Sequence, residues 1–190
     1  MGKKDLKPAG VFKYFEEICQ VPRPSKKEEK MIAYLKAFGA KHNLETKVDE
    51  AGNVLIKKPA TPGKENLQTV VLQSHIDMVC EKNNDVQHDF LTDPIETEID
   101  GEWLKAKGTT LGADNGIGVA TELAILADDS IEHGPLECLF TVDEETGLTG
   151  AFALKEGFMS GDILLNLDSE DEGEIFIGCA GGIDSVAEFT

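Results

Sequence analysis

The sequence predicts a three-layer α/β fold, in which a mixed and mostly parallel sheet is flanked by helices. Three short apolar runs are typical of strands buried on both faces, because they lack the polar–apolar alternation of a half-exposed strand. These runs are residues 69–72, 136–142 and 163–167. Helical patterns precede the second run, over residues 117–127, and the third, over residues 149–156. Such alternation is typical of a parallel or mixed sheet.

Two more helices are predicted near the N-terminus. Apolar residues from Val11 to Cys19 recur at helical spacing, and Pro22-Arg23-Pro24 closes this segment. Residues 25–28, Ser-Lys-Lys-Glu, have the form of a capping box, in which a serine and a glutamate cap each other's backbone N–H groups. The helix behind the box would bury an apolar stripe formed by Met31, Ile32, Leu35 and Phe38.

Two β-hairpins are predicted, both at the periphery of the domain. Val48 and residues 54–56 flank a turn-forming segment, and residues 95–104 enclose the turn Asp100-Gly101. No internal repeat or low-complexity linker marks a domain boundary. The length of 190 residues therefore predicts one domain, or one domain with a part missing.

Composition excludes several classes of function. The chain has 36 Asp and Glu against 18 Lys and Arg, a formal net charge of −18, which disfavours binding to nucleic acid or to an anionic membrane. No apolar run approaches the ~20 residues of a membrane-spanning helix, and no hydrophobic segment follows the N-terminus. The expected location is therefore the cytoplasm.

Polar residues follow each of the three predicted core strands. Residues 74–77 follow the first strand, residues 143–145 the second and residues 168–170 the third. Residues 111–116, Leu-Gly-Ala-Asp-Asn-Gly, form a turn that opens a helix. Because ligands of open α/β sheets bind at the carboxyl ends of the strands, we expect one imidazole and several carboxylates to meet at that edge.

Each motif also has a simpler explanation when it is taken alone. Asp77 could orient the imidazole of His75 for a metal, because residues two apart in a strand face the same side, yet such pairs are more often structural. Glu144 and Glu145 could belong to a solvated acidic loop. Asp114 could be an ordinary turn residue.

Taken together, the motifs predict a metal-dependent hydrolase. Asp168 emerges from an apolar strand, where an ionised carboxylate favours a cation as its partner. Oxygen and nitrogen ligands of this kind suit Zn²⁺, Mn²⁺ or Co²⁺, and a bridging carboxylate would hold two metals about 3.5–4 Å apart. Nucleotide binding is disfavoured, because the chain has no Gly-Lys-Ser/Thr motif and no full Gly-x-Gly-x-x-Gly pattern after a strand.

The same segments closely resemble the M20 metallopeptidase family and, within it, the aminoacyl-histidine (Xaa-His) dipeptidases of the peptidase D and carnosinase type. The resemblance rests on residues 74–82, 111–118, 143–147 and 166–170, and it extends in order to residues 178–182. It implies a zinc-exopeptidase-like catalytic domain that hydrolyses dipeptides with a C-terminal histidine. It also implies a small peptide substrate, two zinc ions and a homodimeric full-length parent.

The resemblance further implies a role for each site residue. The metal ligands would be four side chains that match the family's motifs: His75, Asp114, Glu145 and Asp168. Asp77 would orient His75, and Asp114 would bridge both metals, with a cis peptide bond to Asn115. Glu144 would be the general base that takes a proton from the attacking water and returns it to the leaving amine.

The family also has parts that these 190 residues do not supply. A further histidine ligand for the second metal and a lid or dimerisation domain are expected downstream. Residues 1–182 would be the N-terminal part of the catalytic domain, and residues 183–190 would begin the missing domain. The remaining histidines, His42, His88 and His133, are expected at the surface.

Such a chain could be inactive by itself. Two alternatives therefore stay open. One is a non-catalytic fragment or metal-binding module, and the other is a related M20 amidohydrolase, either an aminotripeptidase or an acylamino-acid deacylase.

Overall fold

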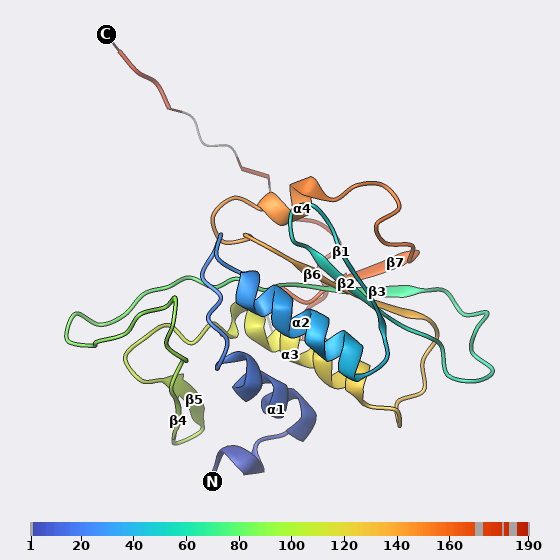
Figure 1. Cartoon of the computed structure of the whole chain (residues 1–190), viewed down its shortest axis with the longest axis horizontal. Coiled ribbons are helices and arrows are strands. Elements are labelled where there is room, and N and C mark those ends of the chain that lie inside the picture. The colour runs from blue at the N-terminus through green and yellow to red at the C-terminus, as the bar shows by residue number, and fades with distance from the viewer. Residues whose placement is uncertain (1, 170–172, 180, 183–185, 190) are drawn as a thin grey trace.

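The computed structural model of the chain describes residues 2–169, 173–179, 181–182 and 186–189 (Figure 1). The helices are η1 (Lys3–Asp5), α1 (Ala9–Ile18), α2 (Glu29–Lys41), α3 (Ala113–Ala127) and α4 (Thr149–Ala153). The strands are β1 (Glu45–Val48), β2 (Val54–Lys58), β3 (Val70–His75), β4 (Thr97–Asp100), β5 (Trp103–Ala106), β6 (Leu136–Thr141) and β7 (Ile163–Asn166). None of the described helices is both long and apolar enough to cross a membrane.

A five-stranded sheet forms the centre of the fold, in the order β1-β2-β6-β3-β7. Strand β3 runs parallel to β6 and to β7, whereas β2 is antiparallel to β1 and β6. His75 at the end of β3 lies opposite Thr141 at the end of β6, and Gln73 lies opposite Asn166 at the end of β7. The predicted mixed sheet is confirmed, and the segments that follow its three parallel strands leave from one edge.

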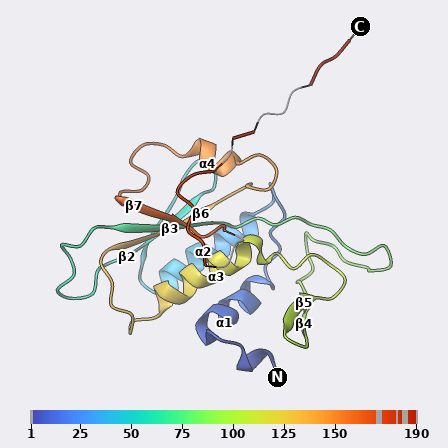
Figure 2. The same cartoon turned by 180° about the vertical axis from the view of Figure 1, so that it is seen from behind.

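Helices cover the two faces of the sheet unequally. Helices α2 and α3 pack on one face, where the core includes Ile56, Leu72 and Phe140, and α1 packs against α3 (Figures 1 and 2). The opposite face is smaller and consists of Leu55, Val71 and Leu139, packed against Leu154, Phe158 and Met159 in the segment after α4. Neighbouring residues of each strand thus point into different layers, because side chains alternate along a strand.

The first predicted hairpin is present, but its expected place at the periphery is wrong. Strand β2 lies inside the sheet between β1 and β6. Its residues Val54, Leu55 and Ile56 have no exposed surface, because both faces of β2 are covered. The second hairpin, β4 and β5, forms a separate two-stranded sheet, as expected of a peripheral element.

The expected burial of the third apolar run on both faces is also wrong. Ile163, Leu164 and Leu165 of β7 are 39%, 47% and 49% exposed. Strand β7 is at the end of the strand order and pairs with β3 alone among the described residues, so it lacks the neighbour that a central strand has.

Two further expectations concern the segment before α2 and the last residues of the chain. The capping box predicted for residues 25–28 is wrong: α2 begins at Glu29, and the Ser25 hydroxyl instead donates to a carboxylate oxygen of Asp77. The strand predicted after residue 181 is not present in residues 181–182 and 186–189, and residues 183–185 and 190 lie outside the described residues.

A buried carboxyl group fixes α3 against β3. Glu122 of α3 is fully buried, and its Oε1 accepts a hydrogen bond of 2.7 Å from the hydroxyl of Ser74, the residue before His75. Burial raises the pKa of Glu122 well above its usual value of 4.5, although the hydrogen bonds from Ser74 and Cys138 oppose this shift. Burial therefore favours the neutral acid over the carboxylate at this position.

We predict that Glu122→Gln makes the folded state less sensitive to rising pH. Between pH 4.5 and the raised pKa, the folded chain holds a proton that the unfolded chain has lost, so the parent loses stability as pH rises. The free energy of unfolding of the glutamine variant should therefore rise relative to that of the parent, by at most about 1.4 kcal/mol per pH unit in that window. Urea unfolding of both proteins from pH 5 to 8 measures this difference, and a difference independent of pH would contradict the prediction.

Candidate metal centre

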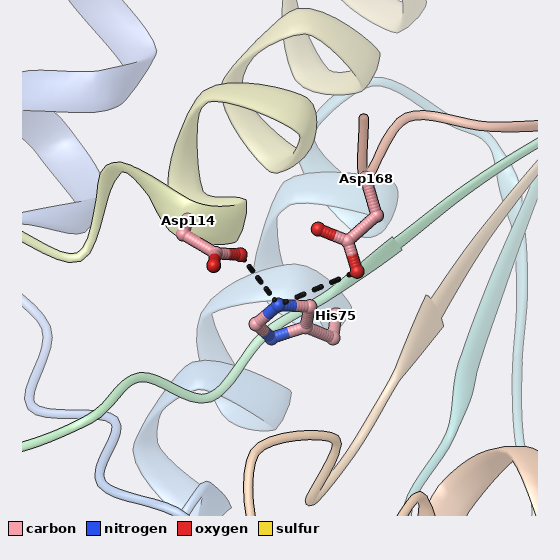
Figure 3. Close-up of side chains that lie close together, drawn as sticks. All are labelled: His75, Asp114 and Asp168. Carbon is pink, nitrogen blue, oxygen red and sulfur yellow. Dashed lines mark hydrogen bonds and ion pairs between the residues drawn. The ribbon is translucent and has the colours of Figure 1, made fainter. Parts of the chain in front are cut away.

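Three predicted ligands meet at the edge where the parallel strands end. His75 is the last residue of β3, Asp114 lies in the first turn of α3, and Asp168 follows β7. His75 Nε2 lies 3.0 Å from Asp114 Oδ1 and 3.8 Å from Asp168 Oδ2 (Figure 3). One ligand atom from each residue lies within 4.8 Å of the others. This spacing is compatible with joint coordination of one cation by a nitrogen and two oxygens.

An irregular helix start directs Asp114 to this edge. Asp114 and Asn115 have non-helical backbone angles inside the first turn of α3, and the peptide bond between them is cis, as the family resemblance implied. The Asp114 side chain remains 59% exposed, whereas Asn115 is buried. The first turn therefore presents one carboxylate toward His75 while the helix body packs into the core.

The Asp77 carboxylate organises the residues around His75. It is fully buried, and its Oδ1 lies 3.2 Å from His75 Nδ1 and accepts a 3.0 Å bond from the Glu144 backbone N–H. Its Oδ2 accepts bonds from the Ser25 hydroxyl at 2.7 Å and from the Glu145 backbone N–H at 3.3 Å. Although burial opposes it, these donors lower the pKa of Asp77 to about 2. Asp77 is thus ionised and turns the Nε2 atom of His75 toward Asp114.

The two adjacent glutamates lie in the loop between β6 and α4. Glu144 Oε2 is 3.9 Å from His75 Nε2, and the Glu144 side chain is 31% exposed. Glu145 is half-buried, and its carboxylate is not part of the group of three ligands found among the described residues. Burial and the negative charges of Asp114 and Glu144 raise the pKa of Glu145. The structure therefore brings Glu144 to His75, and the predicted ligand role of Glu145 stays a prediction.

Negative charge accumulates around the imidazole. Burial, together with the charges of Asp114 and Glu144, raises the pKa of Asp168 to about 6. Burial tends to lower the pKa of His75, but its hydrogen bonds to Asp77 and Asp114 outweigh this and raise it to about 9. The protonated imidazole is then the cation that balances the carboxylates. A divalent cation would balance the same charge with His75 neutral, so these residues fit a metal by their donor types and by their charge.

The other histidines lie elsewhere. His42 stacks on Phe38 with ring centroids 4.4 Å apart, and His88 packs against Phe90 at the same distance. His133 Nδ1 lies 2.7 Å from the backbone carbonyl of Gly134. All three are half-buried rather than fully exposed, and none belongs to the ligand group found among the described residues.

Three residues at the site were assigned other roles from the sequence. Arg23 was expected only to help close a helix, and Ser25 and Glu28 only to cap the next one. The Arg23 guanidinium donates to the backbone carbonyls of Ile76 and Asp77, which directly follow the predicted ligand His75. No local sequence pattern distinguishes these contacts from capping, because their partners are about 50 or more positions away.

The sequence model of the peptidase family M20/M25/M40 matches residues 71–186, which include every predicted site residue. The chain belongs to this peptidase family. It is 54% identical over 179 residues to the cytosol non-specific dipeptidase of Escherichia coli strain K12, an alignment that covers 94% of this chain and 37% of that protein.

Solved structures agree with this assignment. The aminoacylhistidine dipeptidase of Vibrio alginolyticus superposes with a TM-score of 0.91 and 55% identity, covering 94% of this chain and 36% of that one. The aminopeptidase PepT of Bacillus cereus has a TM-score of 0.72 and 26% identity, covering 85% and 43%. The chain therefore spans little more than a third of the length of the dipeptidases that it matches at over 50% identity.

We predict that Asp77→Asn destabilises the metal-free chain by roughly 2–3 kcal/mol, because a buried charged acceptor of several hydrogen bonds is replaced. Because the pKa of this carboxylate is lowered, its contribution to the stability of the folded state is present above pH 3.8 and is lost as pH falls through about 2. The difference between parent and variant should therefore shrink in strong acid. Urea unfolding at neutral and acid pH measures it, with the exposed Asp85→Asn as control. Equal unfolding midpoints of parent and D77N at neutral pH would contradict the prediction.

Proposed function

We propose that this chain carries the main catalytic side chains of a metal-dependent dipeptidase that hydrolyses dipeptides with a C-terminal histidine. The observation that supports this most directly is the convergence of His75, Asp114 and Asp168 at one sheet edge, with Glu144 beside them. The printed names of two relatives at over 50% identity, a non-specific dipeptidase and an aminoacylhistidine dipeptidase, favour a dipeptide substrate.

The proposed metal ligands are His75, Asp114 and Asp168, with Glu145 as a ligand of a second metal that Asp114 bridges. Imidazole nitrogen and carboxylate oxygen suit Zn²⁺, and they also accept Mn²⁺ or Co²⁺. Asp77 holds the Nδ1 side of the imidazole, which leaves Nε2 free for a cation.

In the proposed reaction, bound metal would polarise the scissile carbonyl and acidify a water molecule. Glu144 has a carboxylate that is partly open to solvent and close to His75, which suits a general base. Its carboxylate would accept the proton of the attacking water and then deliver it to the amine nitrogen of the departing histidine. The Glu144 backbone N–H is held by Asp77, so the base and the first ligand share one anchor.

The domain arrangement is part of this proposal. Residues 1–182 would form the N-terminal part of the catalytic domain, and residues 183–190 would begin a lid or dimerisation domain. The chain covers little more than a third of the dipeptidase relatives, which leaves room for such a domain in a protein of their length. A further histidine ligand would come from the rest of such a protein, which we propose to be a cytoplasmic homodimer.

We predict that Glu144→Gln abolishes hydrolysis of Xaa-His dipeptides without removing bound metal, because an amide cannot accept the proton but leaves the ligands intact. The assay uses a polypeptide extended beyond Thr190 to the length of the relatives, in parallel with the 190-residue chain. Metal content is measured on the same samples. The exposed Glu156→Gln is the matched control and should retain activity.

The outcomes separate the assignments. Loss of metal from the Glu144 variant would identify Glu144 as a ligand instead of the base. Hydrolysis by the 190-residue chain would contradict the proposed need for a downstream ligand. An extended polypeptide that cleaves no Xaa-His dipeptide, but cleaves tripeptides, would overturn the substrate class.

A further inference from the structure

A short segment between α1 and α2 contacts three of the loops that border the proposed metal centre. Residues 23–28 lie between these helices, where the sequence suggested only a helix end and a capping box. Their side chains instead bond to the loop after β3, to the turn before α3 and to the loop after β6. The first of these loops directly follows His75, the second directly precedes the helix turn that carries Asp114, and the third contains Glu144.

Arg23 joins the first two of these loops. Its side chain is almost fully buried, and its Nη1 donates to the carbonyl oxygens of Ile76 at 3.2 Å and Asp77 at 3.0 Å. Its Nη2 donates to the carbonyl oxygen of Gly112 at 2.6 Å. The planar guanidinium can bond both loops at once, which a single ammonium group does poorly.

The turn before α3 is shaped to receive this guanidinium. Gly112 has a left-handed φ of +69°, and a Cβ atom there would lie 2.5 Å from Arg23 Nη2. A Cβ atom at Gly116 would lie 2.7 Å from the same nitrogen. Both positions therefore need glycine for the arginine to reach the turn that presents Asp114.

Ser25 and Glu28 hold the remaining parts. The Ser25 hydroxyl donates to Asp77 Oδ2 at 2.7 Å, on the carboxylate that orients His75. Glu28 is buried, and its Oε1 accepts a 3.0 Å bond from the backbone N–H of Asp143, next to Glu144. The backbone adds a bond of 3.2 Å from Met78 N–H to the Arg23 carbonyl.

We propose that Arg23, Ser25 and Glu28 form a positioning clamp that sets the geometry of the metal centre. The clamp holds three loops in register from outside the ligand set, so that the nitrogen and oxygen donors converge before metal binds. None of the three residues is a metal ligand or a catalytic residue. This inference rests on the proposed metal centre, to which it adds three positioning residues.

The most selective test is Ser25→Ala in the 190-residue chain, measured with Zn²⁺ alone by calorimetric titration. Loss of a hydrogen bond that orients a ligand's partner typically weakens metal binding about 10- to 100-fold, so we expect at least a tenfold weaker affinity. Ser25→Thr keeps the hydroxyl and should restore affinity to within about threefold of the parent. Ser130→Ala is the matched control, because Ser130 is exposed and its hydroxyl donates to Asp128, and this variant should bind Zn²⁺ as the parent does.

A second variant, and a measurement on the metal-free chain, test the clamp independently of Ser25→Ala and of metal binding. Arg23→Lys should weaken Zn²⁺ binding more than Ser25→Ala, because a single ammonium group bonds both loops poorly. In the metal-free chain, the imidazole ¹⁵N signals of His75 and the amide signals of Glu144 and Glu145 should shift in S25A and stay in place in S130A. These signals report positioning even if R23K folds poorly.

Three results would overturn an assignment. Unchanged Zn²⁺ affinity and unchanged His75 signals in S25A would refute the clamp. If S25T does not restore the Zn²⁺ affinity lost in S25A, and both variants lose the same thermal stability, Ser25 would have a merely structural role. A parent chain that binds no Zn²⁺ would refute the metal centre in this chain, and the His75 and amide signals would then decide the clamp alone.

Discussion

The buried carboxylate of Asp77 is the contact on which the whole site depends. A buried charge is costly unless it is fully hydrogen-bonded, and Asp77 meets this requirement with donors from three separate parts of the chain. These are the imidazole of His75, the hydroxyl of Ser25 and the backbone N–H groups of Glu144 and Glu145. Each bond that keeps Asp77 ionised also fixes one part of the site. The bonds that stabilise the charge of Asp77 are thus the same bonds that hold His75, Glu144 and Glu145 in place.

The sheet makes this arrangement possible. Strands β6, β3 and β7 are adjacent and parallel, so the chain leaves all three at one edge and the polar residues that follow them come together. Helix α3 adds Asp114 from the side, and the Glu122–Ser74 bond holds that helix beside the end of β3. A strand and a helix therefore supply His75 and Asp114, while the segments after β7 and β6 supply Asp168, Glu144 and Glu145.

The electrostatics of the site favour a cation as well as the geometry does. Asp168 and Glu145 both have raised pKa values, because burial and neighbouring carboxylates disfavour their charged forms. The only positive group of the ligand set is the His75 imidazole, whose pKa is raised to about 9 by its carboxylate partners. Replacing that proton with a divalent cation would relieve the crowding of negative charge. The total charge of −18 is mostly surface, but this cluster accounts for part of it.

Sequence patterns predicted the parts of the fold that depend on local order. The apolar runs at β3, β6 and β7 and the polar residues after them were identified correctly, since strand ends are marked by a change in residue type. Whether a strand lies inside or at the edge of a sheet depends on distant partners, so β2 and β7 were misplaced.

The same limitation applies to Ser25 and Glu28. Their local spacing fits a capping box, and only the folded chain shows that Asp77 and Asp143 are their partners. The convergence of His75, Asp114 and Asp168 could be predicted despite their separation in the sequence, because each lies at or near the end of a recognisable strand or the start of a recognisable helix.

The central claim is that these three residues bind a divalent cation together. Anomalous diffraction at the zinc edge, from crystals of the chain grown with Zn²⁺, tests it most directly. The account predicts a zinc peak bonded to His75 Nε2 and to carboxylate oxygens of Asp114 and Asp168. Zinc bound only at other residues, such as His42 or His133, or no zinc peak at this sheet edge, would contradict it.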